Sequence, residues 1–353
     1  MSATDSAAVP VALVVFNRPD LTRRTLAQVR AAAPADLFVI ADGPRAGHPE
    51  DVARCRATRA VLDEIDWPCT VHRRFAEHNL GLEANVELGL DWLFGLVDRA
   101  VVLEDDCLAD PTFFRFAAEL LERYRDDERI WYLTGNGLGL DPALFDDRSY
   151  AFSAWASVWG WATWADRWQR HRRNFPRDHR PRDGDARGDL PRRATPVPAA
   201  PPTLVTRSAR RHFAEAAASD DTVTHGWDKH WWLTIMTEGG LAVTPAVSMV
   251  QNIGFGIADA THTGGAGGGG DLYGVARPMA FPLRHPDRVE LDVEIERELE
   301  LVLARVGSRS ARLARQLIRS PLLRRLIRRL ISSRAAMIAA RTVSRSTERK
   351  TAK

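Results

Sequence analysis

Cysteine is scarce in this chain of 353 residues, which contains only Cys55, Cys69 and Cys107. The number is odd, and no spacing between the three residues matches a metal-ligand motif. The composition therefore argues against both a disulfide framework and a zinc site, and it is typical of a reducing compartment. We expect a cytoplasmic protein.

Long apolar segments are also missing. The N-terminal residues Met1–Asp5 include no basic residue, and the first apolar run ends near Phe16. This run is too short to span a membrane and is poorly built for a signal peptide. Hydrophobic residues make up 45% and charged residues 27% of the chain, as in soluble globular proteins. The length suits one large α/β domain or two smaller ones.

The charge is unevenly distributed along the chain. Residues 305–353 carry fifteen Lys or Arg residues and one acid, Glu348, which leaves 34 bases and 45 acids for the first 304 residues. Between residues 322 and 331, apolar pairs alternate with arginine pairs, which places them on opposite faces of a helix. We expect residues 291–353 to form a basic helical tail that contacts an anionic membrane surface, at the inner face of the plasma membrane.

Two other partners of the tail are open at this stage. The leucines could dock on the enzyme or on a second subunit, with the arginines in solvent. Nucleic acid is disfavoured, because the tail lacks aromatic residues that stack on bases and the rest of the chain is acidic.

Apolar runs alternate with amphipathic stretches through the first 135 residues. This order predicts an α/β fold with a mostly parallel, doubly wound sheet flanked by helices. Each expected strand ends in polar residues, which gather at one edge, as expected of a nucleotide site. Expected strands cover residues 11–16, 37–41, 70–75, 100–103, 130–134, 241–245 and 247–253, and expected helices lie at 19–29, 52–65, 82–96, 111–125 and 204–219.

The apolar run Ala100–Leu103 ends in three carboxylates, Glu104, Asp105 and Asp106. Carboxylates packed at the mouth of a sheet repel one another and resist desolvation, so such a cluster usually needs a cation. An acidic loop that caps the helix after Pro111 is the simpler alternative. The buried strand directly before the acids favours a metal site.

The second half of the chain is rich in tryptophan. The spacing in residues 157–164 is too irregular for a plain amphipathic helix or an alternating strand. These tryptophans could form a buried plug, or an aromatic wall for a sugar ring, and the two roles are compatible. Residues 176–202 have almost no apolar content, so we expect a disordered insertion that serves as a lid or a spacer.

Two further residues are candidates for chemistry. Asp228 could cap the helix that continues to Met236, or it could be a base that faces the pocket. His262 lies in a segment flanked by glycines and is a candidate metal or phosphate ligand. The glycine run 264–270 indicates a hinge and not a phosphate-binding loop, because it neither follows a strand nor opens a helix.

Seven ordered blocks over residues 9–290 together resemble the GT-A-type nucleotide-sugar glycosyltransferases. Within these, the chain is similar to bacterial relatives of the eukaryotic N-acetylglucosaminyltransferase I group. The resemblance implies one GT-A-type domain at 9–290, with a nucleotide-sugar half at 9–135 and an acceptor half at 136–290. The blocks are Val14–Pro19, Ala41–Gly43, His78–Gly81, Leu103–Asp106, Ser157–Trp164, Gly226–Asp228 and Gln251–Phe255 with Thr261-His262.

The resemblance also implies roles for individual residues. Asp228 corresponds to the general base of inverting members, and Asp106 and His262 would bind Mn²⁺ or Mg²⁺ with the donor diphosphate. The donor would be a nucleotide sugar, and the acceptor a glycan or lipid-linked precursor in polysaccharide biosynthesis. Implied nucleotide-sugar contacts are Asn17, Arg18, Asp42, Asn79, Glu104 and Asp105, and the expected sugar wall is Trp159, Trp161 and Trp227.

The sequence thus predicts a metal-dependent, inverting hexosyl- or N-acetylhexosaminyltransferase. One alternative is a nucleotidyltransferase that makes a nucleotide sugar, but the first strand is followed by Asn17-Arg18-Pro19 and not by a glycine-rich basic loop. The other is a non-catalytic protein that binds a sugar nucleotide and is tethered by its tail; the intact acid triplet and Asp228 argue against it.

Overall fold

The structure is a computed structural model that describes residues 9–155, 157–174, 210, 213–214, 227–254 and 275–306. The chain separates into two compact units, residues 1–300 and 301–353, and the first contains the sheet. The insertion at 176–202 and the tail from residue 307 onward lie outside the described residues, as does nearly all of the helix expected at 204–219.

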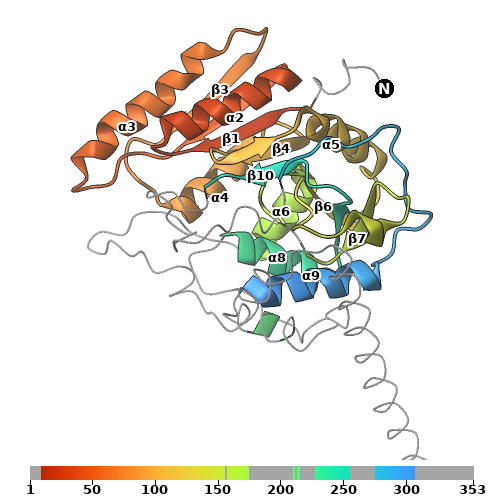
Figure 1. Ribbon diagram of the computed structural model, residues 1–353. Coiled ribbons are helices and arrows are strands. Elements are labelled where there is room, and N and C mark those ends of the chain that lie inside the picture. The colour runs from red at the N-terminus through yellow and green to blue at the C-terminus, as the bar shows by residue number, and fades with distance from the viewer. Residues whose placement is uncertain are drawn as a thin grey trace, which may run out of the picture. The chain divides into compact units, whose positions relative to one another are not determined.

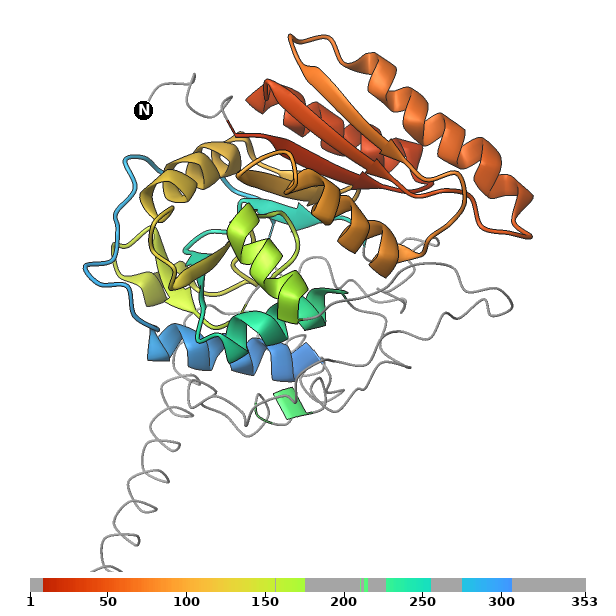
Figure 2. The ribbon, with the colours of Figure 1, turned by 180° about the vertical axis from the view of Figure 1, so that it is seen from behind.

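An eight-stranded sheet forms the centre of the first unit (Figures 1 and 2). Its strand order is β3-β2-β1-β4-β8-β6-β9-β7, and the four strands from β3 to β4 are all parallel. Strand β8 runs antiparallel to both of its neighbours, β9 runs parallel to β6, and β7 runs antiparallel to β9. The strands are β1 Val11–Val15, β2 Asp36–Ala41, β3 Thr70–Phe75, β4 Arg99–Glu104, β6 Ile130–Thr134, β7 Tyr150–Ser153, β8 Trp161–Trp164 and β9 Leu241–Pro245.

The expected α/β fold with a mostly parallel sheet and flanking helices is confirmed. The tryptophan-rich segment differs from expectation, because Trp161–Trp164 forms the strand β8 inside the sheet. All four of its residues are buried, since both faces of the sheet are covered here, and a strand buried on both faces shows no alternation. Likewise, only Val250–Asn252 of the strand expected at 247–253 is extended, as β10, which pairs with β5 (Cys107–Ala109) in a separate two-stranded sheet.

Helices cover both faces of the sheet (Figures 1 and 2). The apolar side chains of α2 and α5 pack on one face, and those of α4, α6 and α8 pack on the other. Three of the helices begin with proline at the first turn, where its fixed φ suits the helix and its missing N–H costs little. The helices are α2 Pro19–Ala32, α3 Pro49–Ala60 with a 3₁₀ turn at Val61–Glu64, α4 Leu82–Leu93, α5 Pro111–Arg123, α6 Ala165–Asn174, α8 Trp227–Thr237 and α9 Val293–Val306.

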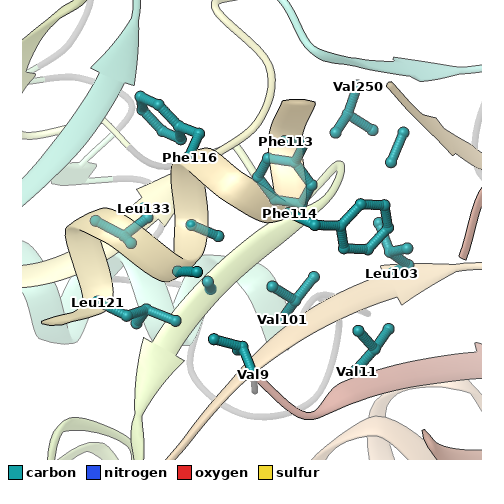
Figure 3. Packing of buried hydrophobic residues seen from close by; sticks show 14 of the residues in the cluster. Val9, Val11, Val101, Leu103, Phe113, Phe114, Phe116, Leu121, Leu133 and Val250 are labelled. Carbon is teal, nitrogen blue, oxygen red and sulfur yellow. The ribbon is translucent and has the colours of Figure 1, made fainter. Parts of the chain in front are cut away.

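Alternate residues of the central strands point to opposite faces, as the pleat requires. In β4, Val101 and Leu103 join the cluster beneath α5, whereas Ala100 and Val102 join the cluster beneath α4 and α8. Figure 3 shows the first of these clusters around Phe113 and Phe114. Two apolar layers therefore hold β4 in place, and the strand delivers Glu104 to the end of the sheet. None of the helices in the described ranges is long and apolar enough to cross a membrane.

Helix α9 contributes buried residues to the first unit. Ile295 and Leu299 are buried, although composition alone assigned residues from 291 onward to the tail. Glu296 is also buried, and its Oε2 accepts a hydrogen bond from the Ala154 backbone N–H at 2.9 Å. Burial raises the pKa of Glu296 from 4.5 to about 8.

The ionised form of Glu296 is therefore less favourable in the folded chain than in the unfolded chain. The folded state binds more protons between these two pKa values, so this group lowers stability as the pH rises from about 4.5 to about 8. We expect Glu296→Gln to raise the free energy of unfolding by about 1–4 kcal/mol at about pH 9 and to change it little at about pH 4. Urea unfolding at the two pH values measures this, with Glu298→Gln on the same helix as the control. Equal gains at both pH values would contradict the assignment.

Candidate functional site

The carboxyl ends of β1, β2 and β4 lie side by side at one edge of the sheet. Val15 pairs with Ala41, and Val14 pairs with Glu104. The polar residues that follow these strands therefore meet at this edge, which is where open α/β sheets bind ligands. The structure brings together the groups after β1, β2 and β4 as expected.

The acid triplet lies at the end of β4 and in the turn that follows it. The Arg18 Nη1 is 3.3 Å from Asp105 Oδ1 and 3.2 Å from Asp106 Oδ2, so one guanidinium contacts both carboxylates. The Thr25 hydroxyl donates to the Asp105 backbone carbonyl at 2.9 Å and fixes the turn. The position of the triplet thus depends on contacts from α2 and from the residue that precedes it.

Burial raises the pKa of all three acids. The pKa of Glu104 lies well above its usual range because burial is reinforced by the charges of Asp106, Asp105 and Asp228. For Asp105 and Asp106 burial is again the main cause, and the Arg18 guanidinium opposes the shift. The ionised forms of these acids are therefore unfavourable in this structure, and a bound cation would stabilise them.

The short sheet of β5 and β10 shapes the wall beside Asp106. Asn252 pairs with Cys107 across this sheet, and its Nδ2 donates to Asp106 Oδ1 at 3.3 Å. A Cβ on Gly254 would lie 2.1 Å from Asp106 Oδ2, so only glycine leaves room for the carboxylate. Carboxylate oxygens are hard ligands, and the three acids outnumber the one Arg18 guanidinium that contacts them, which fits Mn²⁺ or Mg²⁺.

Asp42 follows β2 and is buried. Its Oδ1 accepts hydrogen bonds from the backbone N–H groups of Gly43 and Leu80, both at 2.8 Å, and its Oδ2 accepts one from Asn79 Nδ2 at 2.9 Å. Burial raises the pKa of Asp42, and these hydrogen bonds oppose that effect. The predicted residues Asp42 and Asn79 are therefore in direct contact and together form one wall at the end of β2.

Asn17 is directed away from the acid triplet. Its Nδ2 donates to Asp51 Oδ1 at 2.7 Å, and its backbone carbonyl accepts a hydrogen bond from Arg54 Nε at 2.9 Å. Arg45 also binds Asp51 through two nitrogens and holds the pKa of that carboxyl well below its usual range. The side-chain amide of Asn17 thus anchors α3, and its nucleotide role stays a prediction.

Asp228 lies in the first turn of α8, one residue after the helix begins. It is half-buried, and burial raises its pKa, while the N–H and the charge of Lys229 oppose the rise. Its charge also raises the pKa of Glu104 and of the buried Tyr132 hydroxyl, so Asp228 is close to the acid triplet.

The tryptophans of the expected sugar wall are unequally exposed. Trp161 and Trp227 are buried and stack on each other, with ring centroids 5.7 Å apart. Tyr132 stacks on Trp161 at 5.1 Å, so these rings pack against protein, as the plug alternative expects. Trp159 is half-buried. His262 lies outside the described residues, and its metal role stays a prediction.

Sequence reasoning missed several contacts at this edge. It assigned no role to Thr25 or to Asn252, although Asn252 lies within one of the seven blocks. Their roles depend on tertiary contacts, and a threonine in a helix or an asparagine in a short strand gives no local signal. The glycine at position 254, two residues after Asn252, is the nearest sequence hint of a close backbone approach.

The solved structures that match this chain do so at low sequence identity and low TM-score. They include the mannosyltransferase PcManGT from Pyrobaculum calidifontis in complex with GDP-Man and Mn²⁺, at 15% identity and a TM-score of 0.29, with 44% of each chain covered. UTP-bound UGPase from Acinetobacter baumannii matches at 11% identity and a TM-score of 0.28, over 48% of this chain and 79% of that one. The 4-diphosphocytidyl-2C-methyl-D-erythritol synthase from Anaerococcus prevotii matches at 9% identity and a TM-score of 0.27, over 45% and 73%.

This chain therefore spans less than half the length of the mannosyltransferase. Similarity at this level assigns neither a substrate nor a reaction to the chain. No protein-family model and no curated protein sequence match it.

Gly43 provides a test of the wall around Asp42. An alanine Cβ at this position would lie 2.4 Å from the carbonyl carbon of His78, so the backbone near Asn79 and Leu80 must move. We expect Gly43→Ala to lower the free energy of unfolding by about 1–3 kcal/mol, as overpacking does, in urea denaturation. Gly47→Asn is the control, because its Cβ meets open space and asparagine tolerates the φ of 77° there. If Gly43→Ala and the unchanged chain have the same free energy of unfolding, the backbone around Asp42 can move to accommodate the added Cβ without loss of stability.

Proposed function

We propose that the chain is a metal-dependent, inverting glycosyltransferase that moves a sugar from a nucleotide-sugar donor to a hydroxyl of a polysaccharide or glycolipid precursor. The observation that carries the proposal is the meeting of three features at one edge of the sheet. These are the hydrogen-bonded wall around Asp42, the acid triplet ending at Asp106, and Asp228 on α8, whose charge acts on Glu104.

The donor would lie along the ends of β1, β2 and β4. Asp42 and Asn79 would bind the nucleoside end, Arg18 the phosphates, and Glu104 and Asp105 the ribose and the surroundings of the metal. Asp106, with His262, would hold Mn²⁺ or Mg²⁺, which when bound neutralises charge on the departing nucleoside diphosphate. The excess of carboxylates over cations among the described site residues supports this assignment.

Asp228 would act on the acceptor side. A general base takes the proton from the acceptor hydroxyl as that oxygen attacks the anomeric carbon, opposite the leaving group. A raised pKa brings a carboxylate closer to the working pH of such a base, and burial raises the pKa of Asp228. The attack inverts the anomeric configuration, which proton NMR of the product's anomeric centre reads directly.

The surroundings of the enzyme belong to the same proposal. The basic tail would contact the anionic inner face of the plasma membrane, where a lipid-linked acceptor would also be found. Vesicle sedimentation with and without residues 305–353 tests this contact, and equal binding by both forms would exclude it.

If Asp228 is the general base, its replacement should slow sugar transfer without weakening donor binding. With a panel of UDP-, GDP- and dTDP-sugars and Mn²⁺, we expect Asp228→Asn to lower the transfer rate by about 10²–10⁴-fold, because the base is lost. Donor affinity, measured by calorimetry, should stay close to that of the unchanged chain. Asp147→Asn, an exposed carboxylate, is the matched control. Full transfer by Asp228→Asn would refute the assignment, and release of pyrophosphate from UTP and a sugar phosphate would favour a nucleotidyltransferase.

The Asp106 assignment predicts a loss of metal binding. We expect Asp106→Ala to abolish the nucleotide-dependent binding of Mn²⁺, followed by electron paramagnetic resonance, together with the transfer activity. Glu122→Ala, a carboxylate paired with Arg99 on the surface, should bind Mn²⁺ as the unchanged chain does. Tight nucleotide binding by the unchanged chain without any turnover would instead favour a non-catalytic protein.

A further inference from the structure

Helix α4 carries a stripe of acids that the site described above does not use. Glu83, Glu87 and Asp91 are spaced by four residues and so lie on one side of the helix. The apolar side of α4, which includes Val86 and Leu90, packs on the sheet. The acids instead meet side chains of α6 and α8, and we name these three residues the acidic stripe.

The contacts of the acidic stripe run along α4 in order. Asp91 accepts hydrogen bonds from Trp168 Nε1 at 2.9 Å and from Arg172 Nε at 3.0 Å. The same guanidinium donates to Glu87 Oε2 at 2.7 Å. At the start of α4, Glu83 Oε1 lies 3.4 Å from His230 Nδ1 on α8. The stripe therefore ties α4 first to α6 and then to α8.

Most of these contacts are shielded from solvent, although the Asp91 side chain is 36% exposed. The Glu87 side chain is 1% exposed, and those of His230 and Glu83 are 7% and 13% exposed. The Glu87–Arg172 ion pair is therefore screened little by salt, and loss of one partner would leave an uncompensated charge inside the protein. The Glu83–His230 contact is thus well placed to hold one helix against the other.

Glu83 and His230 each lie close in sequence to residues of the proposed site. Glu83 is the second residue of α4 and follows closely on Asn79 and Leu80, which bind Asp42. His230 lies two residues after Asp228, in the first turn of α8. The first turn of a helix has backbone N–H groups without partners inside the helix, so side-chain contacts strongly influence its position.

We propose that Glu83 and His230 are positioning residues whose contact fixes the first turn of α8 and thereby the place of Asp228 relative to the acid triplet. The consequence for catalysis rests on the proposed function, whereas the contact and its effect on α8 do not.

A divalent cation is the competing occupant of this region. The ligand atoms of Glu83, Glu87 and His230 all lie within 4.8 Å of one another, which a metal ion could bridge. Arg172 favours the positioning role, because its guanidinium binds both a Glu87 oxygen and an Asp91 oxygen and so already compensates the charge of these acids.

Hydrogen exchange of the full-length protein tests the contact without reference to activity. In Glu83→Gln, we expect the peptide covering residues 227–231 to take up deuterium several times faster, and Glu83→Asp, which keeps the charge, to restore part of the protection. Glu238→Gln is the matched control, because Glu238 pairs with Arg170 and Asn174 beyond the other end of α8. Unchanged exchange at residues 227–231 in Glu83→Gln would overturn the proposal.

Kinetics test the consequence for the reaction. Displacement of a catalytic group by about 1 Å lowers the rate by up to about 100-fold, so we expect a kcat about 10- to 100-fold lower in Glu83→Gln and a donor KM within about twofold. Glu238→Gln should keep both constants. An unchanged kcat in Glu83→Gln would show that the contact does not affect catalysis. If the unchanged chain transfers no sugar, the proposed function is wrong, but the hydrogen-exchange test of the contact remains valid.

Calorimetry with Mn²⁺ or Zn²⁺ alone separates the two occupants. We expect Asp106→Ala to bind no stoichiometric metal ion at the acidic stripe. One equivalent bound by Asp106→Ala and lost in Asp106→Ala with His230→Gln would overturn the positioning role in favour of a metal site.

Discussion

The constraint on which this structure depends is the repulsion among carboxylates that are buried at the end of β4. Water cannot screen the charges of Glu104, Asp105 and Asp106 fully, and Asp228 adds a fourth. The fold tolerates them because β4 is held between two apolar layers and because Arg18 contacts two of the three. Such an arrangement is unfavourable for stability alone, and residues that break the rules of packing in this way are typical of functional sites.

Much of the fold follows from local patterns. The strands Thr70–Phe75, Ile130–Thr134 and Leu241–Pro245 have the bounds expected from the sequence, and Pro111 begins a helix as expected. The meeting of Asp42 with the acid triplet was also predictable, because parallel strands that end in polar residues place those residues at one edge.

Other features could not be predicted because they depend on partners far away in the sequence. The strand at Trp161–Trp164 has no alternation, because Trp161 joins the cluster beneath α4 and α8 while Trp164 joins the cluster beneath α5. Asn17 looks like a ligand-binding residue beside Arg18, but the structure directs its amide to Asp51. Glu296 was assigned to the tail by composition, but in the structure its side chain is buried together with Ile295 and Leu299 of the same helix.

The acidic stripe shows the same limit most clearly. Acids spaced by four on a helix are usually in solvent, and the sequence gives no sign that Glu87 is buried beneath Arg172. The structure shows that the polar side of α4 is an interface with two other helices. Asp228 lies in the first turn of α8, which its own helix fixes less than any internal turn, so a contact from α4 matters for its position. The sheet thus positions the acid triplet at the end of β4, whereas the turn that carries Asp228 is contacted by a side chain of α4.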